Sequence, residues 1–324
     1  MTLDAQILSA LRRAEPAAVL VHDLCGETGV AQEVIASRIQ QLRALGYDIE
    51  ASPHYGYRLI DSPDALHADD LLARLGATRV IGRDIRVFDE TASTNDVAEK
   101  LARDGVREGA VIFAESQSKG RGRLGRRWHS PARKGLWFSV LIRPPLPLQS
   151  ATQLTVIAAT SVARAVRRVA GLTPQIKWPN DILIHGRKAV GILTELNAEL
   201  DQVRWIVLGI GVDVNVTEFP AELRTIATSL ALEAERQIDR AELATAILQE
   251  LDDDYARICA GGFSSLAEEW EQQCVTLGRR VRIGAGDNFI SGRAESLDSD
   301  GALLLRTDYG RLERIVGGDV VIEQ

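Results

Sequence analysis

Apolar residues recur at helical spacing through the first part of the chain, which predicts three helices. The first carries its apolar positions three or four residues apart, at Leu3, Ile7, Leu8 and Leu11. A second short helix is predicted over 19–25, ending at Gly26, and a third over 34–45, where Gly46 suits the C-terminal cap. Two strand-like runs follow, at 47–50 and 55–59. This order is the layout of a winged helix-turn-helix over residues 1–62.

The middle of the chain alternates apolar strand-like runs with longer helical patterns. The strands are predicted at 84–88, 110–115, 135–142, 176–184, 188–196 and 205–212. The helices are predicted at 66–75, from Ser93 or Thr94 to Ala102, and at 152–170, 239–259 and 265–273. Asp239 and Glu242 give the 239–259 helix a start that resembles a capping box.

Short strands separated by Gly and Asp fill the last part of the chain. They are predicted at 280–283, 290–297, 302–307, 312–316 and 320–322. Five such strands in this space favour a small SH3-like barrel. The chain of 324 residues is long enough for several domains, and we expect boundaries at 1–62, 63–275 and 276–324.

The composition is that of an ordinary globular protein in a reducing compartment. Hydrophobic residues make up 45% and charged residues 26%, and no apolar run reaches membrane-spanning length. The start of the chain lacks the pattern of a signal peptide, so we expect a cytoplasmic protein. The three cysteines (Cys25, Cys259 and Cys274) form no CxxC pair, which argues against disulfides and a structural zinc site. We therefore expect no protein-built metal site.

A basic, glycine-rich stretch stands out against the formal net charge of -7. Three glycines and five cations lie between Gln117 and Arg127. Glycine allows close backbone approach to a ligand, and arginine matches phosphate or carboxylate. We expect this loop to close over a small molecule that carries phosphate.

Two other interpretations of the same stretch remain. Gly120, Gly122 and Gly125 match a dinucleotide-binding pattern, but the residues 128–131 that follow cannot open a helix well. A solvated basic loop, or a nucleic-acid-binding segment rich in Arg and Gly, is the plainer alternative. Apolar runs on both sides favour a loop held in a folded domain.

Further polar residues stand where strands end. Lys177 lies between Ile176 and Trp178 just before a proline; an exposed lysine on an edge strand is the alternative interpretation. Asp213 and Asn215 follow a glycine-containing strand, and their oxygens could hold a metal–phosphate group or form an ordinary turn. Ser93 and Thr94 could cap a helix or form a polar pocket wall.

The predicted winged helix has a poor charge for binding nucleic acid. Residues 1–62 contain five arginines, no lysine and eight acids, a net charge of -3. On the third helix, Arg38 and Arg43 are the only cations available for DNA. A module that serves only to join domains is the alternative.

Taken together, the motifs resemble those of biotin–protein ligases, in particular the bacterial family that also represses the biotin operon. The resemblance covers nearly the whole chain. The family's motifs stand here at Ser93 to Asn95, Gly120 to Arg126, Lys177 to Asp181 and Gly191 to Glu195. It implies an α+β fold: a winged helix-turn-helix, a central mixed sheet of the class II synthetase type, and an SH3-like barrel.

The resemblance also implies roles for individual residues. Those expected to bind biotin are Ser93, Thr94, Asn95, Gln117, Arg121, Gly122, Arg123 and Lys177. Those expected to bind ATP or the adenylate are Arg121, Arg123, Lys177, Asp213 and Asn215. Arg121, Arg123 and Lys177 would act in catalysis by stabilising negative charge on the transferred phosphate. The family often has Asn where this chain has Asp213.

The implied reaction has two steps. Biotin attacks the α-phosphate of ATP, which carries Mg2+, giving biotinyl-5′-AMP and pyrophosphate. A lysine of a biotin carboxyl carrier protein, that of acetyl-CoA carboxylase, then attacks the acyl carbon. The implied partners also include operator DNA and a second copy of the chain, forming a homodimer when biotinyl-AMP is bound, and no membrane.

Three rival functions differ in class. A lipoate or octanoate ligase shares the catalytic fold and the adenylate chemistry. A biotin-sensing DNA-binding regulator would need little ligase activity, although Lys177 and Arg123 are present. An RNA-binding protein would need aromatic stacking residues beside the loop, and none accompany it.

Overall fold

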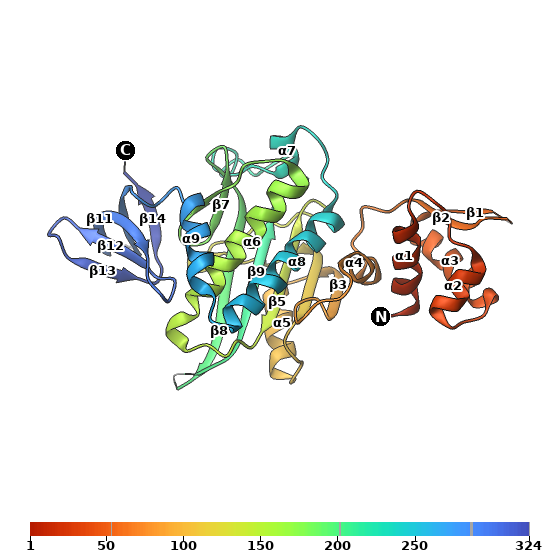
Figure 1. Cartoon of the computed structure of the whole chain (residues 1–324). Helices are drawn as coiled ribbons and strands as arrows, with labels where there is room; N and C mark the ends of the chain where they lie inside the picture. The colour runs from red at the N-terminus through yellow and green to blue at the C-terminus, as the bar shows by residue number, and fades with distance from the viewer. Residues whose placement is uncertain (53, 201, 286–287, 324) are drawn as a thin grey trace.

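The computed structural model describes residues 1–52, 54–200, 202–285 and 288–323. It arranges the chain in three successive parts (Figure 1). A small helical unit and a small sheet lie at opposite ends, and a large sheet flanked by helices lies between them. This is the predicted order of parts. We propose the same boundaries as before, 1–62, 63–275 and 276–324, because each sheet falls within one of these ranges.

The N-terminal unit is a winged helix. Its helices are α1 (Leu3–Ala14), α2 (Val21–Thr28) and α3 (Gln32–Ala44), and its wing is the antiparallel pair β1 (Asp48–Ser52) and β2 (Gly56–Asp61). The predicted end of the second helix at Gly26 is wrong, because the helix continues to Thr28. Gly29 ends it in a left-handed conformation (φ 72°), and its N–H donates to Cys25 O.

Helix α4 (Ala68–Leu75) joins this unit to the rest of the chain by packing on α1. A cluster of charges lies between the two helices. Asp70 is only 4% exposed and accepts hydrogen bonds from Arg12 of α1 and Arg74 of α4. Arg74 also lies 3.3 Å from Asp239.

The described part of the central unit holds a seven-stranded sheet in the order β3-β4-β5-β9-β8-β7-β6. Its strands are β3 (Asp84–Thr91), β4 (Ala110–Gln117), β5 (Leu136–Ile142), β6 (Gln175–Lys177), β7 (Asp181–Ile184), β8 (Arg187–Glu199) and β9 (Gln202–Val212). Strands β3 and β4 are parallel and the other neighbours antiparallel, so the sheet is mixed, as expected.

Helices cover both faces of this sheet. Alternation along β5 points Phe138 and Val140 to one face and Ser139 and Leu141 to the other. The first face packs against α6 (Thr152–Ala170), α8 (Arg240–Cys259) and α9 (Phe263–Gln273), which Figure 1 shows side by side. The second face packs against α5 (Thr94–Arg103). Three short helical segments lie in the connections: η1 (Arg123–Gly125), η2 (Leu148–Ser150) and α7 (Leu230–Ala234).

The C-terminal unit is an antiparallel sheet in the order β13-β12-β11-β10-β14. Its strands are β10 (Arg280–Ala285), β11 (Asn288–Leu297), β12 (Leu303–Thr307), β13 (Leu312–Ile315) and β14 (Asp319–Ile322). Val281, Leu303 and Leu305 are buried in the same apolar core as the central sheet. The two units therefore share one continuous core.

Candidate functional site

A cavity of about 630 Å³ opens on the sheet face that carries α5. Its wall comes from the start of α5, the basic loop after β4, the β6–β7 hairpin, strands β8 and β9, and residues 318–321 of the C-terminal unit. Of the predicted site residues it includes Ser93, Thr94, Asn95, Gln117, Arg121, Gly122, Arg123, Lys177 and Asp213. Segments from all along the central unit thus meet one segment of the C-terminal unit at a single place.

A buried polar wall stands at the N-terminus of α5. Ser93 and Asn95 are 3% and 4% exposed. Thr94 N–H donates to Gln117 Oε1 (2.9 Å), and Ser139 Oγ donates to Asn95 Oδ1 (2.5 Å). Ser93 occupies the cap position of α5 without making a side-chain cap bond, and it lines the cavity. This wall offers both donors and acceptors to a small polar ring.

Glycines give the sheet floor its depth. Gly209 and Gly211 of β9 and Gly191 of β8 lie on the α5 face of the sheet. A Cβ at Gly209 would lie 2.3 Å from Asn95 Oδ1, and one at Gly211 would lie 2.5 Å from Trp128 Nε1. Any larger residue would displace these side chains. The glycines therefore make room for the polar wall and for Trp128.

The basic loop folds over the cavity and rests on the C-terminal unit. Gly122 N–H donates to Arg126 O (2.7 Å), and Gly125 turns the loop at φ 74°. Arg123 donates to Asn180 Oδ1 (3.1 Å) and to Gly318 O (3.4 Å), while Arg126 pairs with Asp319. Burial lowers the pKa of Arg123, although nearby carboxylates oppose the shift. The loop runs into η1 rather than a full helix, so the dinucleotide-binding alternative lacks its helix.

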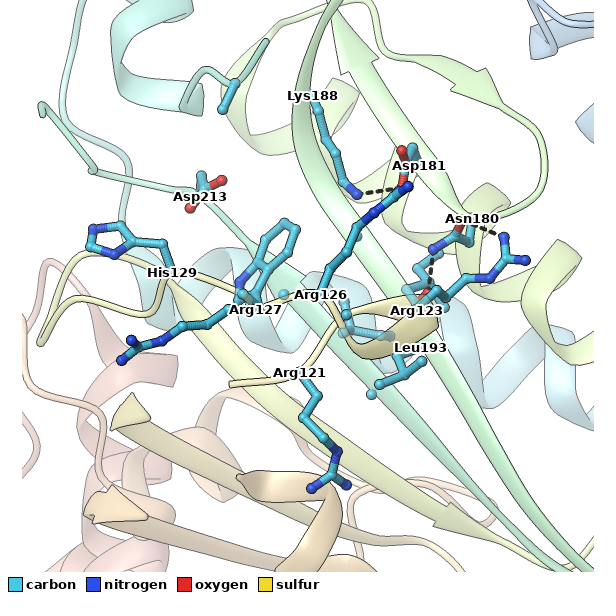
Figure 2. A pocket seen from close by; sticks show the side chains of 18 of the residues that line it. Arg121, Arg123, Arg126, Arg127, His129, Asn180, Asp181, Lys188, Leu193 and Asp213 are labelled. Atoms are coloured by element: carbon cyan, nitrogen blue, oxygen red, sulfur yellow. Dashed lines mark hydrogen bonds and ion pairs between the residues drawn. The ribbon is translucent and has the colours of Figure 1, made fainter. Parts of the chain in front are cut away.

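Arg121 lines the cavity as expected, but its charge is paired with two carboxylates. Its guanidinium donates to Asp96 Oδ1 (2.5 Å) and to Glu195 Oε2 (3.1 Å). Figure 2 shows Arg123 and Asn180 turned toward each other while Arg121 points away from them. Arg121 thus borders the cavity with its charge already paired, and the structure does not place it beside Arg123 as a second phosphate ligand.

Two lysines supply positive charge from the β6–β8 part of the sheet. Lys177 lines the cavity at the end of β6, where its backbone pairs with Asp181, and its ammonium group makes no hydrogen bond or ion pair with the side chains and backbone that the structure describes. Lys188 of β8 pairs with Asp181 at 2.6 Å (Figure 2). Its ammonium group also lies 5.2 Å from the centre of the Trp128 ring. Sequence reasoning missed Lys188, Trp128 and Asn180 as site residues. Lys188 could have been found, since it begins the predicted strand 188–196, which directly follows the predicted strand carrying Lys177.

Asp213 and Asn215, predicted together, have different surroundings. Asp213 is 4% exposed, lines the cavity, and has one carboxylate oxygen without a hydrogen-bond partner among the described residues. Burial raises the pKa of Asp213 well above its usual value, and the charge of Lys188 opposes that shift. The Asn215 amide instead exchanges two hydrogen bonds with the backbone of Ile238. Asn215 therefore serves the local fold and is not among the residues lining the cavity.

The two arginines predicted to contact DNA are also engaged. Arg43 donates to Ile49 O of the wing (2.9 Å), which ties α3 to β1. Arg38 donates to Gln41 Oε1 (2.7 Å) and lies 3.6 Å from Asp4. The solvent-facing polar side chains of α3 are Gln32, Glu33, Ser37, Gln40 and Gln41. Glutamine side chains can hydrogen-bond to the edge of adenine in DNA, so this face offers groups suited to base contacts but little positive charge.

The residues that the structure describes contain no group of three or more His, Cys, Asp or Glu side chains that could hold a metal ion. None of their helices is both long and apolar enough to cross a membrane.

Known protein families match three consecutive parts of the chain. An HTH domain matches residues 4–58, the biotin/lipoate A/B protein ligase family matches 87–213, and the biotin protein ligase C terminal domain matches 276–322. The bifunctional ligase/repressor BirA of Bacillus subtilis (strain 168) is 39% identical over 295 residues, which cover 90% of each chain. The chain belongs to the biotin protein ligase family.

Other members of the biotin protein ligase family agree with this assignment. The biotin--[acetyl-CoA-carboxylase] ligase of Mycobacterium tuberculosis is 35% identical over 74% of this chain and 89% of its own. The solved structure of the Aquifex aeolicus biotin protein ligase in complex with biotin and ATP has a TM-score of 0.64 and 29% identity, and the match covers 75% of this chain and 99% of that one. The predicted family and fold are confirmed.

Proposed function

We propose that the chain activates biotin with ATP and then transfers the biotinyl group to a lysine of a biotin carboxyl carrier protein. One observation carries the proposal in a chain of this family. The polar wall formed by buried Ser93 and Asn95 with half-buried Gln117 lines the same cavity as the cations Arg123 and Lys177. Such a cavity suits a substrate with a polar ring at one end and a carboxylate that meets phosphate at the other.

In the first step, a carboxylate oxygen of biotin attacks the α-phosphorus of ATP. The bond from that phosphorus to the bridging oxygen breaks, and pyrophosphate leaves with the electron pair. Ser93, Thr94, Asn95 and Gln117 would hold the ureido ring, and Gly122 would allow the loop backbone to approach the ligand. Arg123, Lys177 and Lys188 would stabilise the charge that grows on the phosphate oxygens.

In the second step, the neutral amine of the acceptor lysine attacks the acyl carbon of biotinyl-5′-AMP. An amide bond forms, AMP leaves with the electrons of the broken C–O bond, and the amine proton passes to solvent. The adenylate is a mixed anhydride that water can hydrolyse. The basic loop, resting on Asn180 and Gly318, would limit the access of water until the carrier arrives.

Mg2+ belongs in this proposal as part of the MgATP substrate. Magnesium usually contacts one or two protein carboxylates and the substrate phosphates. The unpartnered oxygen of Asp213 fits that requirement, because it is a hard oxygen ligand in the wall of the cavity. Asp213 would hold the ion, which would neutralise phosphate charge when bound. We propose no ligand role for Asn215.

Pyrophosphate exchange into ATP, with biotin, lipoate or octanoate as the only added acid, tests the reaction. We expect exchange with biotin alone. Exchange that needs lipoate or octanoate instead would move the chain to the sister activity within the matched family. No exchange with any of the three would contradict adenylation and favour a sensor of biotin without ligase activity.

We also propose that the winged helix binds operator DNA, with the solvent-facing side of α3 as the contact surface. The match to an HTH domain supports this role, while the net charge of -3 on residues 1–62 predicts weak binding. A homodimer formed with biotinyl-5′-AMP bound would double the contact surface. Fluorescence anisotropy of labelled operator fragments, recorded with and without biotin and ATP, measures DNA binding and its dependence on these ligands. Binding unchanged by the ligands would contradict a biotin-responsive repressor.

The proposed location is the cytoplasm, where ATP and the acetyl-CoA carboxylase carrier are available. The cysteines Cys25, Cys259 and Cys274 are all free thiols, which suits a reducing compartment.

A further inference from the structure

Glu195 of β8 joins two walls of the cavity that are far apart in sequence. It lies on the same face of β8 as Gly191 and Leu193, the face that carries α5. Asn95 Nδ2 of the polar wall donates to Glu195 Oε2 (2.7 Å). Arg121 of the basic loop donates to both oxygens of the same carboxylate (3.1 and 3.3 Å). One side chain therefore contacts both the biotin side and the phosphate side of the proposed site.

The side-chain amide of Asn95 is held by a hydrogen bond at its oxygen and another at its nitrogen. Its Oδ1 accepts from Ser139 (2.5 Å), and its Nδ2 donates to Glu195. Gly209 beneath it lets the amide lie close to the sheet, in the space that a Cβ would fill. Glu195 thus fixes which edge of the Asn95 amide faces the cavity.

Arg121 lies in the basic loop between Gly120 and Gly122. Just before it, backbone bonds from Ser118 to Thr91 O and from Lys119 to Ala92 O hold the loop to the end of β3. Beyond that point, Arg121 connects the loop to Glu195 and to Asp96 of α5. Arg123 and Arg126, farther along, contact the β6–β7 turn and the C-terminal unit instead.

From these contacts we infer that Glu195 is a positioning residue that couples the polar wall at the start of α5 to the position of the basic loop. In this role Arg121 is the partner of Glu195 and does not bind phosphate. The inference rests on the proposed function. A biotin ring bound to Asn95 holds the amide that Glu195 contacts, and Glu195 in turn holds Arg121 and the root of the loop. Neither Glu195 nor Arg121 takes part in bond making.

The test uses Glu195→Ala, Arg121→Ala and the double variant in the full chain. We expect the KM for biotin in pyrophosphate exchange to rise about tenfold in Glu195→Ala, because a buried amide loses its partner, while kcat changes less than about threefold. Each variant should also release more free biotinyl-5′-AMP per carrier modified. The double variant should show no larger defect than the more impaired of the two single variants, because each single change already removes the contact between Glu195 and Arg121.

Glu195→Gln serves as the conservative variant. It keeps an acceptor for Asn95 but weakens the contact with Arg121, so it should restore the KM for biotin while adenylate release stays raised. Glu199→Ala is the matched control, because Glu199 lies on the same strand and pairs with Arg204 at the surface. It should match the unmodified chain in both measurements.

Two results would overturn the inference. If Arg121→Ala lowers kcat about a hundredfold while Glu195→Ala exchanges normally, Arg121 contacts phosphate directly. If both single variants are normal and the unmodified chain exchanges with biotin, Glu195 has no positioning role and the proposed function still stands. Failure of the unmodified chain to exchange would instead overturn the proposed function first, and the coupling with it.

Discussion

Lys177 ends β6 with its charge unpaired among the described residues and lines the cavity beside Asn180. Lys177→Ala should lower the rate of pyrophosphate exchange by about a hundredfold or more, because a charge aimed at the transferred phosphate is lost. The expected effect lies in kcat, with the KM for biotin little changed. Lys100→Ala on the exposed side of α5 should leave exchange unchanged. Normal turnover by Lys177→Ala would remove it from the catalytic residues.

Asp213 carries a cost in the ligand-free protein that depends on pH. Burial raises its pKa in the folded state, so the folded chain holds a proton that the unfolded chain has already lost. Folding stability should therefore fall as pH rises from the unfolded pKa of Asp through the folded one. Asp213→Asn removes this loss, so its Tm should exceed that of the unmodified chain near neutral pH.

The Tm difference should shrink in acid, where the protonated Asp213 resembles Asn. Melting curves from about pH 4 to about pH 8, recorded without Mg2+ or ATP, measure this trend. A Tm difference that stays constant over the range would mean that Asp213 is ionised throughout. The same variant should bind MgATP more weakly if Asp213 holds the ion.

Sequence patterns located most of the site residues but not the directions of long side chains. Asn95, Gln117, Arg123 and Lys177 lie at the cavity as expected. Arg121 reaches the cavity edge, yet its guanidinium turns to Glu195, which lies 74 positions away in sequence. Residue types and spacing do not fix such a distant partner. Asn215 was misplaced for a similar reason, because its partner Ile238 lies in another segment.

At the scale of single elements, the glycines of β9 set the distance between the sheet and α5. Gly209→Ala would place a Cβ 2.3 Å from Asn95 Oδ1. The Asn95 amide should be displaced from Ser139, and the KM for biotin should rise about tenfold or more. Gly26→Ala is a useful control, because no heavy atom lies within 4 Å of the new Cβ and helix α2 should tolerate or favour alanine. Unchanged biotin kinetics in Gly209→Ala would separate Asn95 from the biotin wall.

Periodicity predicted most helices and strands correctly because each has a clear inner face. Helix α6 and strand β5 match their predicted ranges closely. Helix α2 does not, because Gly26 is a poor helix former that nevertheless stays helical when the next residues are held. Thr28 Oγ1 donates to Leu24 O, and Gly29 supplies the left-handed end. The sequence contains two glycines that could end the helix, Gly26 and Gly29, and residue type alone does not show which of them does so.

At the scale of the whole molecule, Asp70 holds the winged helix against the catalytic part. Asp70→Ala would leave Arg12 and Arg74 near each other without the carboxylate between them. The free energy of unfolding should fall by about 2–3 kcal/mol. This is less than for a fully buried ion pair, because both arginines reach solvent. Limited proteolysis in the connection between β2 and α4, at 62–67, should become faster, and melting should broaden as the units separate.

Arg13→Ala is the matched control for this change, since Arg13 pairs with Glu27 on the exposed side of the same unit. It should leave both proteolysis and melting unaltered. Equal cleavage rates in Asp70→Ala and the unmodified chain would mean that apolar packing of α1 on α4 is sufficient. No sequence pattern indicated this contact, because its three charges come from two predicted domains.

The contacts of the basic loop with Gly318 and Asp319 have a consequence for how the protein is made. A ribosome releases the chain from its N-terminus, and domains fold in that order. The cavity walls up to β9 can therefore form while residues 318–321, which complete the cover, are still inside the ribosome. A nascent chain has a place for biotin before it has a fastened cover over the reactive adenylate. A chain that stops before Gly318 should therefore keep the place for biotin but lose its activated product to water.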